Sequence, residues 1–339
     1  IDKVLIIGSG PIVIGQACEF DYSGTQACKA LREQGYKIVL VNSNPATIMT
    51  DPVMADATYI EPLNVKRLEE IIEKERPDAL LPNLGGQTGL NLACELNKAG
   101  VLDKYGVKVI GVNLEEIERG EDREIFKATM QKLGIDTPRS GICHTVEEAE
   151  KIVSEIGFPV VVRPAYTMGG TGGGFCYNVE ELRTICSNGL ELSMTHQCLI
   201  EESILGWEEL EVEVVRDAKN QMIAICFIEN IDPVGVHTGD SFCAAPFLTI
   251  SKDLENRLKE QAFKIVESIG VIGGTNVQFA HDPKSDRVVI IEINPRTSRS
   301  SALASKATGF PIAFVSAKLA AGLTLDQIPY WRDGSLEKY

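Results

Sequence analysis

Short apolar runs alternate with amphipathic helical stretches along the first 112 residues, and this alternation constrains the fold more than any other feature. Lys3–Ile7 and Lys37–Asn42 are apolar runs, Ser23–Gln34 lies between them as a helical stretch, and Val65–Glu75 is a charged amphipathic stretch. Strands that alternate with helices predict a parallel sheet with helices packed on its faces. We therefore expect an α/β, Rossmann-like domain over residues 1–112.

The pattern changes twice after this domain. Residues 113–145 contain two helical stretches and predict a helical connector. Residues 146–205 combine helices, short strands and a glycine-rich loop, which predicts a small α+β unit. Residues 206–339 are rich in strands and are interrupted by the helical stretch Lys252–Ile269, which predicts a second, strand-based unit.

Charge and cysteine usage exclude several classes of protein. The net charge is −15 and the pI about 4.9, which disfavours nucleic acid and anionic membranes as partners because both need a basic surface. The nine cysteines are odd in number and show no C-x-x-C spacing, so neither a zinc site nor a disulfide framework is expected. With no long apolar run or signal peptide, we expect a reduced, cytoplasmic protein.

The glycines Gly8 and Gly10 follow the first predicted strand and suggest a dinucleotide-binding fingerprint. The spacing fails, because Val13 stands where the third glycine belongs. The second strand ends at Asn42, where a site for NAD needs an acidic residue. A glycine-rich turn at this position has a steric explanation, so we expect no dinucleotide site.

A second glycine-rich loop, Thr167–Gly174, lies between two predicted strands and lacks the Lys-Ser/Thr ending of a P-loop. Its free backbone N–H groups can approach phosphate oxygens, and its glycines let it move as a lid. Arg163, at the end of the preceding strand, adds a cation. The pair predicts phosphate binding; a flexible surface hairpin is the alternative.

Acidic residues follow the next strand, at Glu202 and again at Glu209. A strand edge there can bind adenine and a carboxylate can hold ribose hydroxyls. The pattern alone favours a simpler interpretation, an acidic surface turn.

The strongest candidate site is a predicted antiparallel hairpin around the turn Asp282–Asp286. Residue alternation places Glu292 and Asn294 on one face, with Gln278 nearly opposite Glu292. Three converging oxygen ligands suit Mg²⁺. A solvent-facing polar row is the alternative, but the flanking residues are strongly apolar.

Two arginines, Arg296 and Arg299, follow this hairpin and predict a site for an anionic second substrate, with structural ion pairing as an equal alternative. His237 lies in a glycine-bounded loop. No Ser/His/Asp or Cys/His spacing predicts a covalent nucleophile. The expected chemistry is phosphoryl transfer by positioning and electrostatics.

Long motifs place these residues in a known family. They are Gly10–Gly24, Asn42–Asp51, Gly85–Thr88, Thr167–Gly174, Gly235–Ser241 and Asn294–Gly309. From residue 1 to about 325 the chain resembles the large subunit of carbamoyl-phosphate synthase, in its first, bicarbonate-phosphorylating half. These motifs are much more specific than general ATP-grasp patterns.

The resemblance implies a fold, a reaction and partners. The fold is a pre-ATP-grasp domain followed by an ATP-grasp fold, with a lid subdomain over residues 146–205 and an antiparallel nucleotide- and metal-binding sheet over residues 206–339. The reaction is ATP-dependent phosphorylation of bicarbonate to carboxyphosphate, the first step of carbamoyl phosphate synthesis for arginine and pyrimidines. In the complete enzyme, ammonia, a glutaminase small subunit and a second synthase half take part.

The resemblance also implies roles for individual residues. Phosphate contacts are implied for Arg123, Arg163, Gly169 and Gly170, and nucleotide contacts for Glu202, Ile204, Glu209, Gly235, Val236 and His237. It implies that Gln278, Glu292 and Asn294 hold Mg²⁺ or Mn²⁺, that Gln278 and Glu292 also contact the nucleotide, and that Arg296 and Arg299 join Glu292 and Asn294 in catalysis. Asn230 and Ser241 are implied contributors to a K⁺ site near the ribose.

Two other functions remain open from the sequence. The family pattern ends after Asp326, which favours a truncated fragment that binds ATP without turnover. Another ATP-grasp carboxylate ligase, such as a biotin carboxylase, is the second, although the motif Ser300–Gly309 argues against it. The chain holds one set of these motifs, so we expect that it cannot release carbamoyl phosphate alone.

Overall fold

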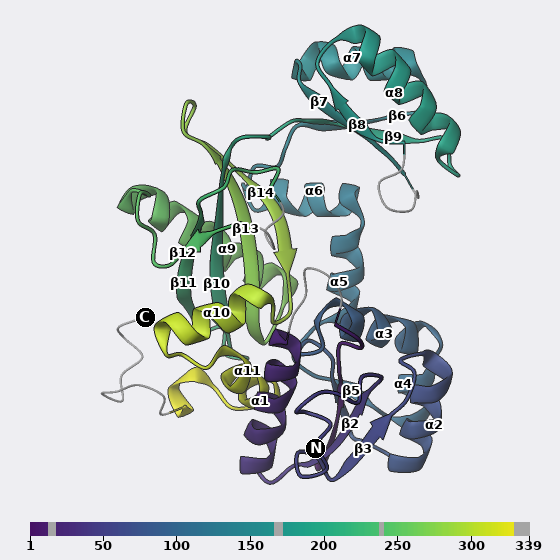
Figure 1. Cartoon of the computed structure of the whole chain (residues 1–339), viewed down its shortest axis with the longest axis vertical. Helices are drawn as coiled ribbons and strands as arrows, with labels where there is room; N and C mark the ends of the chain where they lie inside the picture. The colour runs from purple at the N-terminus through teal and green to yellow at the C-terminus, as the bar shows by residue number, and fades with distance from the viewer. Residues whose placement is uncertain (13–17, 166–171, 237–240, 329–339) are drawn as a thin grey trace.

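The computed structural model describes residues 1–12, 18–165, 172–236 and 241–328, which form three β-sheets with helices packed around them (Figure 1). Val13, Gly169, Gly170 and His237, on which sequence predictions depend, lie outside the described residues. In the described part of the chain, no helix is both long enough and apolar enough to cross a membrane.

The first sheet is parallel, as the alternation predicts. Its strands follow the order β3-β2-β1-β4-β5. They are β1 (Lys3–Ile7), β2 (Lys37–Asn42), β3 (Ala57–Ile60), β4 (Ala79–Leu81) and β5 (Lys108–Val109). The helices of this part are α1 (Glu19–Glu33), α2 (Val65–Glu75), α3 (Gly86–Lys98) and α4 (Val101–Tyr105).

Both faces of the first sheet are buried, because successive residues of each strand point to opposite sides. Leu5 and Ile7 pack with residues of α2, α3 and α4, whereas Val4 and Ile6 pack with residues of α1. The second cluster also contains residues of α11 (Ile312–Ala320), so a helix from the far end of the chain covers the first sheet. The turn before α3 needs glycine, since a Cβ on Gly85 would lie 2.2 Å from the carbonyl oxygen of Ile7.

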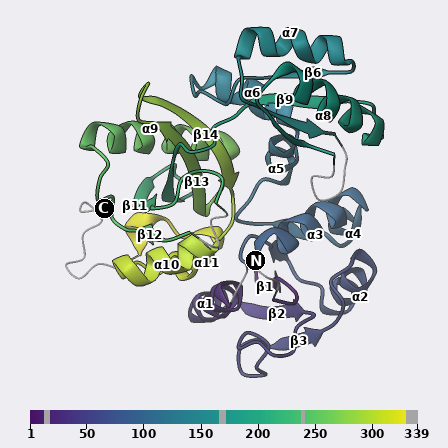
Figure 2. The same cartoon turned by 45° about the horizontal axis from the view of Figure 1, so that its top comes forward.

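Two short helices, α5 (Leu114–Glu121) and α6 (Arg123–Lys132), form the predicted helical connector. The side chains of Asn113 and Asp122 accept hydrogen bonds from backbone N–H groups of the first turn of each helix, which stabilises both starts. In both views α5 and α6 lead from the first sheet toward the small unit at the opposite end of the molecule (Figures 1 and 2). The predicted domain boundaries themselves remain a prediction.

That small unit, residues 140–202, is called the lid unit here. Its sheet is antiparallel, in the order β6-β9-β7-β8. Its elements are β6 (Ser140–Cys143), α7 (Val146–Ile156), β7 (Val160–Pro164), β8 (Gly174–Cys176), α8 (Val179–Leu192) and β9 (Cys198–Glu202). The strands β7 and β8 pair directly, which confirms that the glycine-rich loop joins two strands of a hairpin.

The third sheet, called the central sheet here, is antiparallel in the order β12-β11-β10-β13-β14. Its strands are β10 (Glu208–Arg216), β11 (Met222–Asn230), β12 (Cys243–Ala244), β13 (Gly273–Asp282) and β14 (Arg287–Asn294). The helix α9 (Lys252–Ile269) packs on one face through an apolar cluster. Residues of α10 (Arg299–Thr308) and α11 pack on part of the other face and leave the rest of it polar.

Candidate active site

The uncovered face of the central sheet carries rows of polar side chains that cross three strands. Strand register places Glu211 of β10, Gln278 of β13 and Glu292 of β14 side by side. Directly opposed residues of an antiparallel sheet project from the same face. The apolar side chains of these strands face α9 instead, so the polar rows form one continuous acidic and amide surface.

The register confirms the predicted pairing of Gln278 with Glu292. A β-bulge follows at Gln278 and Phe279, and such bulges redirect side chains near functional sites. Glu292 is exposed, Gln278 is half-buried and Asn294 is buried. The exposed carboxylate of Glu292 therefore lies directly opposite the amide of Gln278 on the neighbouring strand.

A second row contains residues that the sequence analysis missed. Glu213 of β10 lies beside Asn276 of β13, and Asn276 pairs with Asn294. Asn276 Nδ2 is 2.9 Å from Glu211 Oε2 and 2.8 Å from Glu213 Oε1. Acids at every second position, Glu209, Glu211 and Glu213, were a signal that one face of this strand is acidic.

Serines at the start of α10 complete the environment of Glu213. Ser300 Oγ donates to Glu213 Oε1 at 2.5 Å, and Ser301 Oγ donates to Oε2 at 3.1 Å. The carboxylate is buried, and its three donors offset part of the desolvation cost of burying an acid. This cluster joins α10 to the central sheet.

Acidic side chains gather in this site. The pKa of Glu209 is raised to about 7 by burial and then by the charges of Glu211 and Glu292. Among the described residues, no group of three His, Cys, Asp or Glu side chains is arranged to bind a metal ion. A divalent cation here would therefore take Glu292, amide oxygens and oxygens from a ligand, a donor set that suits Mg²⁺ or Mn²⁺.

The basic partner of this acidic surface is Arg296. Its Nη2 donates to Asn294 Oδ1 at 3.2 Å and its Nε donates to Gln87 Oε1 of α3 at 3.3 Å. Burial lowers the pKa of Arg296, opposed by the charges of Glu292 and Glu213. Gln87 comes from the Gly85–Thr88 motif of the first domain, which the sequence analysis did not connect with this arginine.

The contact between Arg296 and Asn294 bears on the predicted metal ligands. Asn294 Oδ1 accepts a hydrogen bond from the arginine, so this oxygen is already engaged. Its role as a metal ligand remains a prediction, which requires this contact to open. Arg299 is the first residue of α10 and is half-buried beside the serine cluster.

Two of the segments predicted to contact the nucleotide lie side by side where the lid unit joins the central sheet. The backbone N–H of Gly206 donates to Val234 O at 3.0 Å, and that of Val234 donates to Trp207 O at 2.9 Å, so the turn after Glu202 lies beside the segment that contains Gly235 and Val236. Gly235 has a φ of 116°, and a Cβ there would lie 2.3 Å from Leu205 Cδ1. Ile204 is half-buried in the turn.

Glu202 itself is engaged elsewhere. Its carboxylate accepts from the backbone N–H of Arg139 at 2.7 Å and lies 2.7 Å from Arg287 Nη1. Any contact of Glu202 with a nucleotide base is thus left to its backbone. Of the predicted K⁺ ligands, Ser241 Oγ lies 3.5 Å from Asn230 Oδ1, and Asn230 Nδ2 lies 3.0 Å from Glu211 Oε1.

The two predicted phosphate-binding arginines lie on other elements. Arg163, in β7 of the lid unit, is half-exposed with its Nη2 3.4 Å from Glu201 Oε1. Arg123 is exposed at the start of α6. The structure does not bring either into contact with the polar rows of the central sheet.

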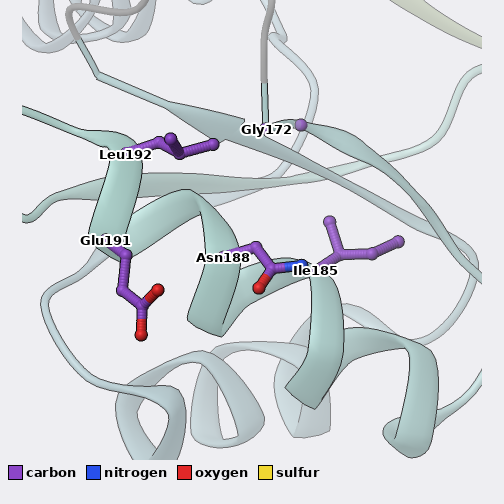
Figure 3. Close-up of a pocket in the computed structure, with 6 residues that line it drawn as sticks. Gly172, Ile185, Asn188, Glu191 and Leu192 are labelled. Carbon is purple, nitrogen blue, oxygen red and sulfur yellow. The ribbon is translucent and has the colours of Figure 1, made fainter.

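A pocket of about 340 Å³ lies on the lid unit, beside the end of the glycine-rich loop (Figure 3). Its lining residues are Gly172, Gly173, Ile185, Asn188, Glu191 and Leu192. Leu192 points toward Gly172 across it. Gly172 and Gly173 belong to the predicted phosphate-binding loop, but the pocket contains none of the predicted metal ligands or arginines, so we place the chemistry on the central sheet.

Glu213 makes the stability of the fold depend on pH. Burial raises its pKa to about 7, although hydrogen bonds from Ser300 and Asn276 oppose the shift. An unfolded glutamate titrates near 4.3. Between these values the folded state binds more protons than the unfolded state, so stability falls as pH rises through this window.

We expect Glu213→Gln to remove this contribution. Between pH 5 and 8 the wild-type protein should lose on the order of 3 kcal/mol more unfolding free energy than the variant. Chemical unfolding at the two pH values measures the difference, and Glu180→Gln, an exposed site in the lid unit, is the matched control. Equal pH slopes in wild type and Glu213→Gln would contradict this assignment.

Comparison with known families identifies two domains along the chain. Residues 1–119 match the family described as carbamoyl phosphate synthase preATP-grasp domain. Residues 122–328 match the family described as carbamoyl-phosphate synthase L chain, ATP binding domain. The two matches meet at the helical connector.

Curated relatives support the same family. The chain is 62% identical over 330 residues to the carbamoyl phosphate synthase large chain of Archaeoglobus fulgidus, covering 97% of this chain and 31% of that protein. It is 60% identical over 329 residues to the "Carbamoyl phosphate synthase large chain, N-terminal section" of Aquifex aeolicus, covering 97% and 59%. The chain thus spans 31% of the first relative and 59% of the second.

Solved structures show the fold. A biotin carboxylase from Campylobacter jejuni superposes with a TM-score of 0.74 at 23% identity, covering 96% of this chain and 72% of that one. An N5-carboxyaminoimidazole synthetase from Staphylococcus aureus gives 0.66 at 21% identity, covering 94% and 77%. At this identity the likeness confirms the ATP-grasp fold and no more. The motifs, the two family matches and the relatives together show that this chain belongs to the carbamoyl-phosphate synthase large-chain family, with its pre-ATP-grasp and ATP-binding domains.

Proposed function

We propose that this chain uses ATP to phosphorylate bicarbonate, giving ADP and carboxyphosphate. The observation that carries the proposal is the acidic and amide row of Glu211, Gln278 and Glu292 beside the half-buried guanidinium of Arg296. Acidic and amide oxygens suit a metal-bound triphosphate, and an arginine suits a small anionic acceptor. Phosphoryl transfer needs these two sites next to each other.

The residues divide the work by position. The turn at Ile204 and the segment at Gly235 and Val236 offer backbone groups to the adenine, and Glu209 lies at the sheet end nearest them, in reach of the ribose. A divalent cation held by Gln278, Glu292 and Asn294 would neutralise charge on the phosphates. Arg296 orients bicarbonate so that one of its oxygens faces the terminal phosphate.

The lid unit supplies the remaining phosphate contacts in this account. Arg163 and the loop that contains Gly169 and Gly170 belong to the lid hairpin, and Arg123 begins α6 on the path to it. Closing of the lid over the nucleotide would bring them to the phosphates and exclude water. Arg299 supports the acceptor end of the site from the start of α10.

A monovalent cation fits beside the ribose. Asn230, Ser241, Glu209 and Glu211 gather oxygen atoms there, and K⁺ would balance the charge of the two neighbouring carboxylates. In the complete enzyme we place this half with a glutaminase subunit that supplies ammonia and with a second synthase half that uses the product. The account places the enzyme in the cytoplasm, where its thiols stay reduced.

Nucleotide choice tests the proposal. We expect MgATP to give a saturable binding heat in calorimetric titration and NADH to give none, because Asn42 cannot replace the acidic ribose ligand of an NAD site. Asn42 Oδ1 instead accepts from the backbone N–H of Gly10 at 3.0 Å. Tight binding of NADH together with weak binding of ATP would overturn the proposed function.

A further inference from the structure

The lid unit is joined to the rest of the protein by two chain segments. The chain enters it through residues 133–139 and leaves it through residues 203–207, called the hinge segments here. Figure 1 shows the lid unit apart from the central sheet, with these segments between them. The orientation of the lid therefore depends on what holds the two segments.

One side chain of the central sheet, Arg287 at the start of β14, contacts the first hinge segment. Its Nε donates to Asp136 Oδ2 at 2.7 Å and its Nη2 donates to Thr137 O at 3.3 Å. The backbone N–H of Ile290 also donates to Asp136 O at 3.0 Å. The entry segment is thus bound along β14 by both side-chain and backbone contacts.

The same guanidinium reaches the exit side. Its Nη1 lies 2.7 Å from the carboxylate of Glu202, the last residue of the lid sheet, and its plane lies over Trp207 with 5.8 Å to the ring centroid. The planar fork of an arginine presents donors to an acid, a carbonyl and a second acid in one fixed geometry. Arg287 therefore contacts the entry segment at Asp136 and Thr137. On the exit side it contacts Trp207 and the bordering residue Glu202.

Glu202 makes this contact costly to break. Its side chain is 9% exposed, and Arg139 at the end of the entry segment also donates to it through its backbone N–H and its Nε. Removing the arginine would leave a buried carboxylate with fewer partners, which costs more than losing a surface ion pair. The carboxylate of Glu202 therefore links Arg139, which borders the lid unit on the entry side, to Arg287.

We propose that Arg287 is a positioning residue that sets the orientation of the lid unit relative to the central sheet. The consequence for ATP rests on the function proposed above. Arg163 is in β7, which pairs with β9, the strand that Glu202 ends. A rotation at the hinge would move Arg163 relative to Glu292, so the hinge governs ATP binding more than bicarbonate binding.

Spin-label distances test the orientation without any turnover. Cys18 and Cys243 are the exposed cysteines and are replaced by Ser, after which Met194→Cys on the lid unit and Lys252→Cys on α9 carry the labels. Without nucleotide we expect a narrow distance distribution in this background and a broadened or shifted one in Arg287→Met. In the unlabelled protein, we expect the KM for ATP to rise about tenfold while the KM for bicarbonate stays within twofold.

A neighbouring arginine provides the matched control. Arg257 lies on α9 and forms an ion pair at 2.8 Å with Asp286, in the turn that precedes Arg287. Both side chains are more exposed than that of Arg287, and Arg257 contacts neither hinge segment. Arg257→Met should leave both the distances and the KM values unchanged. Asp136→Asn removes an exposed partner of Arg287, and we expect it to shift both readouts in the same direction by less.

Unchanged distances and an unchanged KM for ATP in Arg287→Met would overturn the proposal, as would equal effects in Arg257→Met. The distances are measured on the resting protein. A broadened distribution would therefore support the hinge role even if the chain showed no bicarbonate-dependent turnover. A lack of that turnover would reject the proposed function and not the hinge role.

Discussion

Glu292→Gln should lower bicarbonate-dependent ATP turnover at least about a hundredfold, a loss of about 3–5 kcal/mol of transition-state stabilisation. Glu292 is the exposed acid of the central row, opposite Gln278. The substitution keeps its shape and removes only its charge. A metal–phosphate complex that forms there would lose its carboxylate ligand from β14.

The fold should survive this change, because Glu292 is exposed and apolar contacts of β14 come from its other face. The thermal midpoint should match wild type, and the Mg²⁺ concentration for half-maximal turnover should rise. Glu255→Gln, on α9 behind the sheet, is the control and should keep full activity. Near-normal turnover in Glu292→Gln would remove this residue from the site.

The hairpin of the site could be predicted because its signals are local. Apolar alternation around the turn Asp282–Asp286 indicates two strands, and β14 has the bounds expected from its sequence. A period of two places Gln278 and Glu292 on one face once they are paired. The only uncertainty was one residue of register, which the bulge beside Gln278 explains.

Other elements carry weaker local signals. The strand β6 (Ser140–Cys143) and the strand β3 (Ala57–Ile60) were not predicted, because each is short and half-exposed and lacks a clear alternation. The helix α1 begins at Glu19, four residues before the predicted Ser23. The helix α3 was not predicted either; it begins at Gly86, and glycine is a poor helix former.

Long-range contacts could not be predicted from periodicity. The packing of α11 on the first sheet and the hydrogen bond from Arg296 to Gln87 join residues more than 200 positions apart. The cluster around Glu213 could not be predicted either, because its serine donors lie in another element, α10. The ion pair between Glu202 and Arg287 could not be predicted for the same reason, because only the tertiary structure places these two residues together.

The transfer of oxygen from bicarbonate to phosphate tests the central claim most directly. In carboxyphosphate formation a bicarbonate oxygen attacks the terminal phosphorus of ATP, and the bond between that phosphorus and the ADP oxygen breaks. Without an ammonia acceptor, carboxyphosphate decays by cleavage of its carbon–oxygen bond, and the bicarbonate oxygen stays on the phosphate. Hydrolysis of ATP by water would leave no such oxygen.

The measurement uses ¹⁸O-bicarbonate, MgATP and the 339-residue chain, with mass analysis of the inorganic phosphate soon after mixing, before the label exchanges with water. We predict one ¹⁸O atom in each phosphate formed above the bicarbonate-free background, and none above background in Glu292→Gln. Phosphate that forms at a bicarbonate-stimulated rate without the label, or ATP cleavage that bicarbonate does not change, would contradict the account.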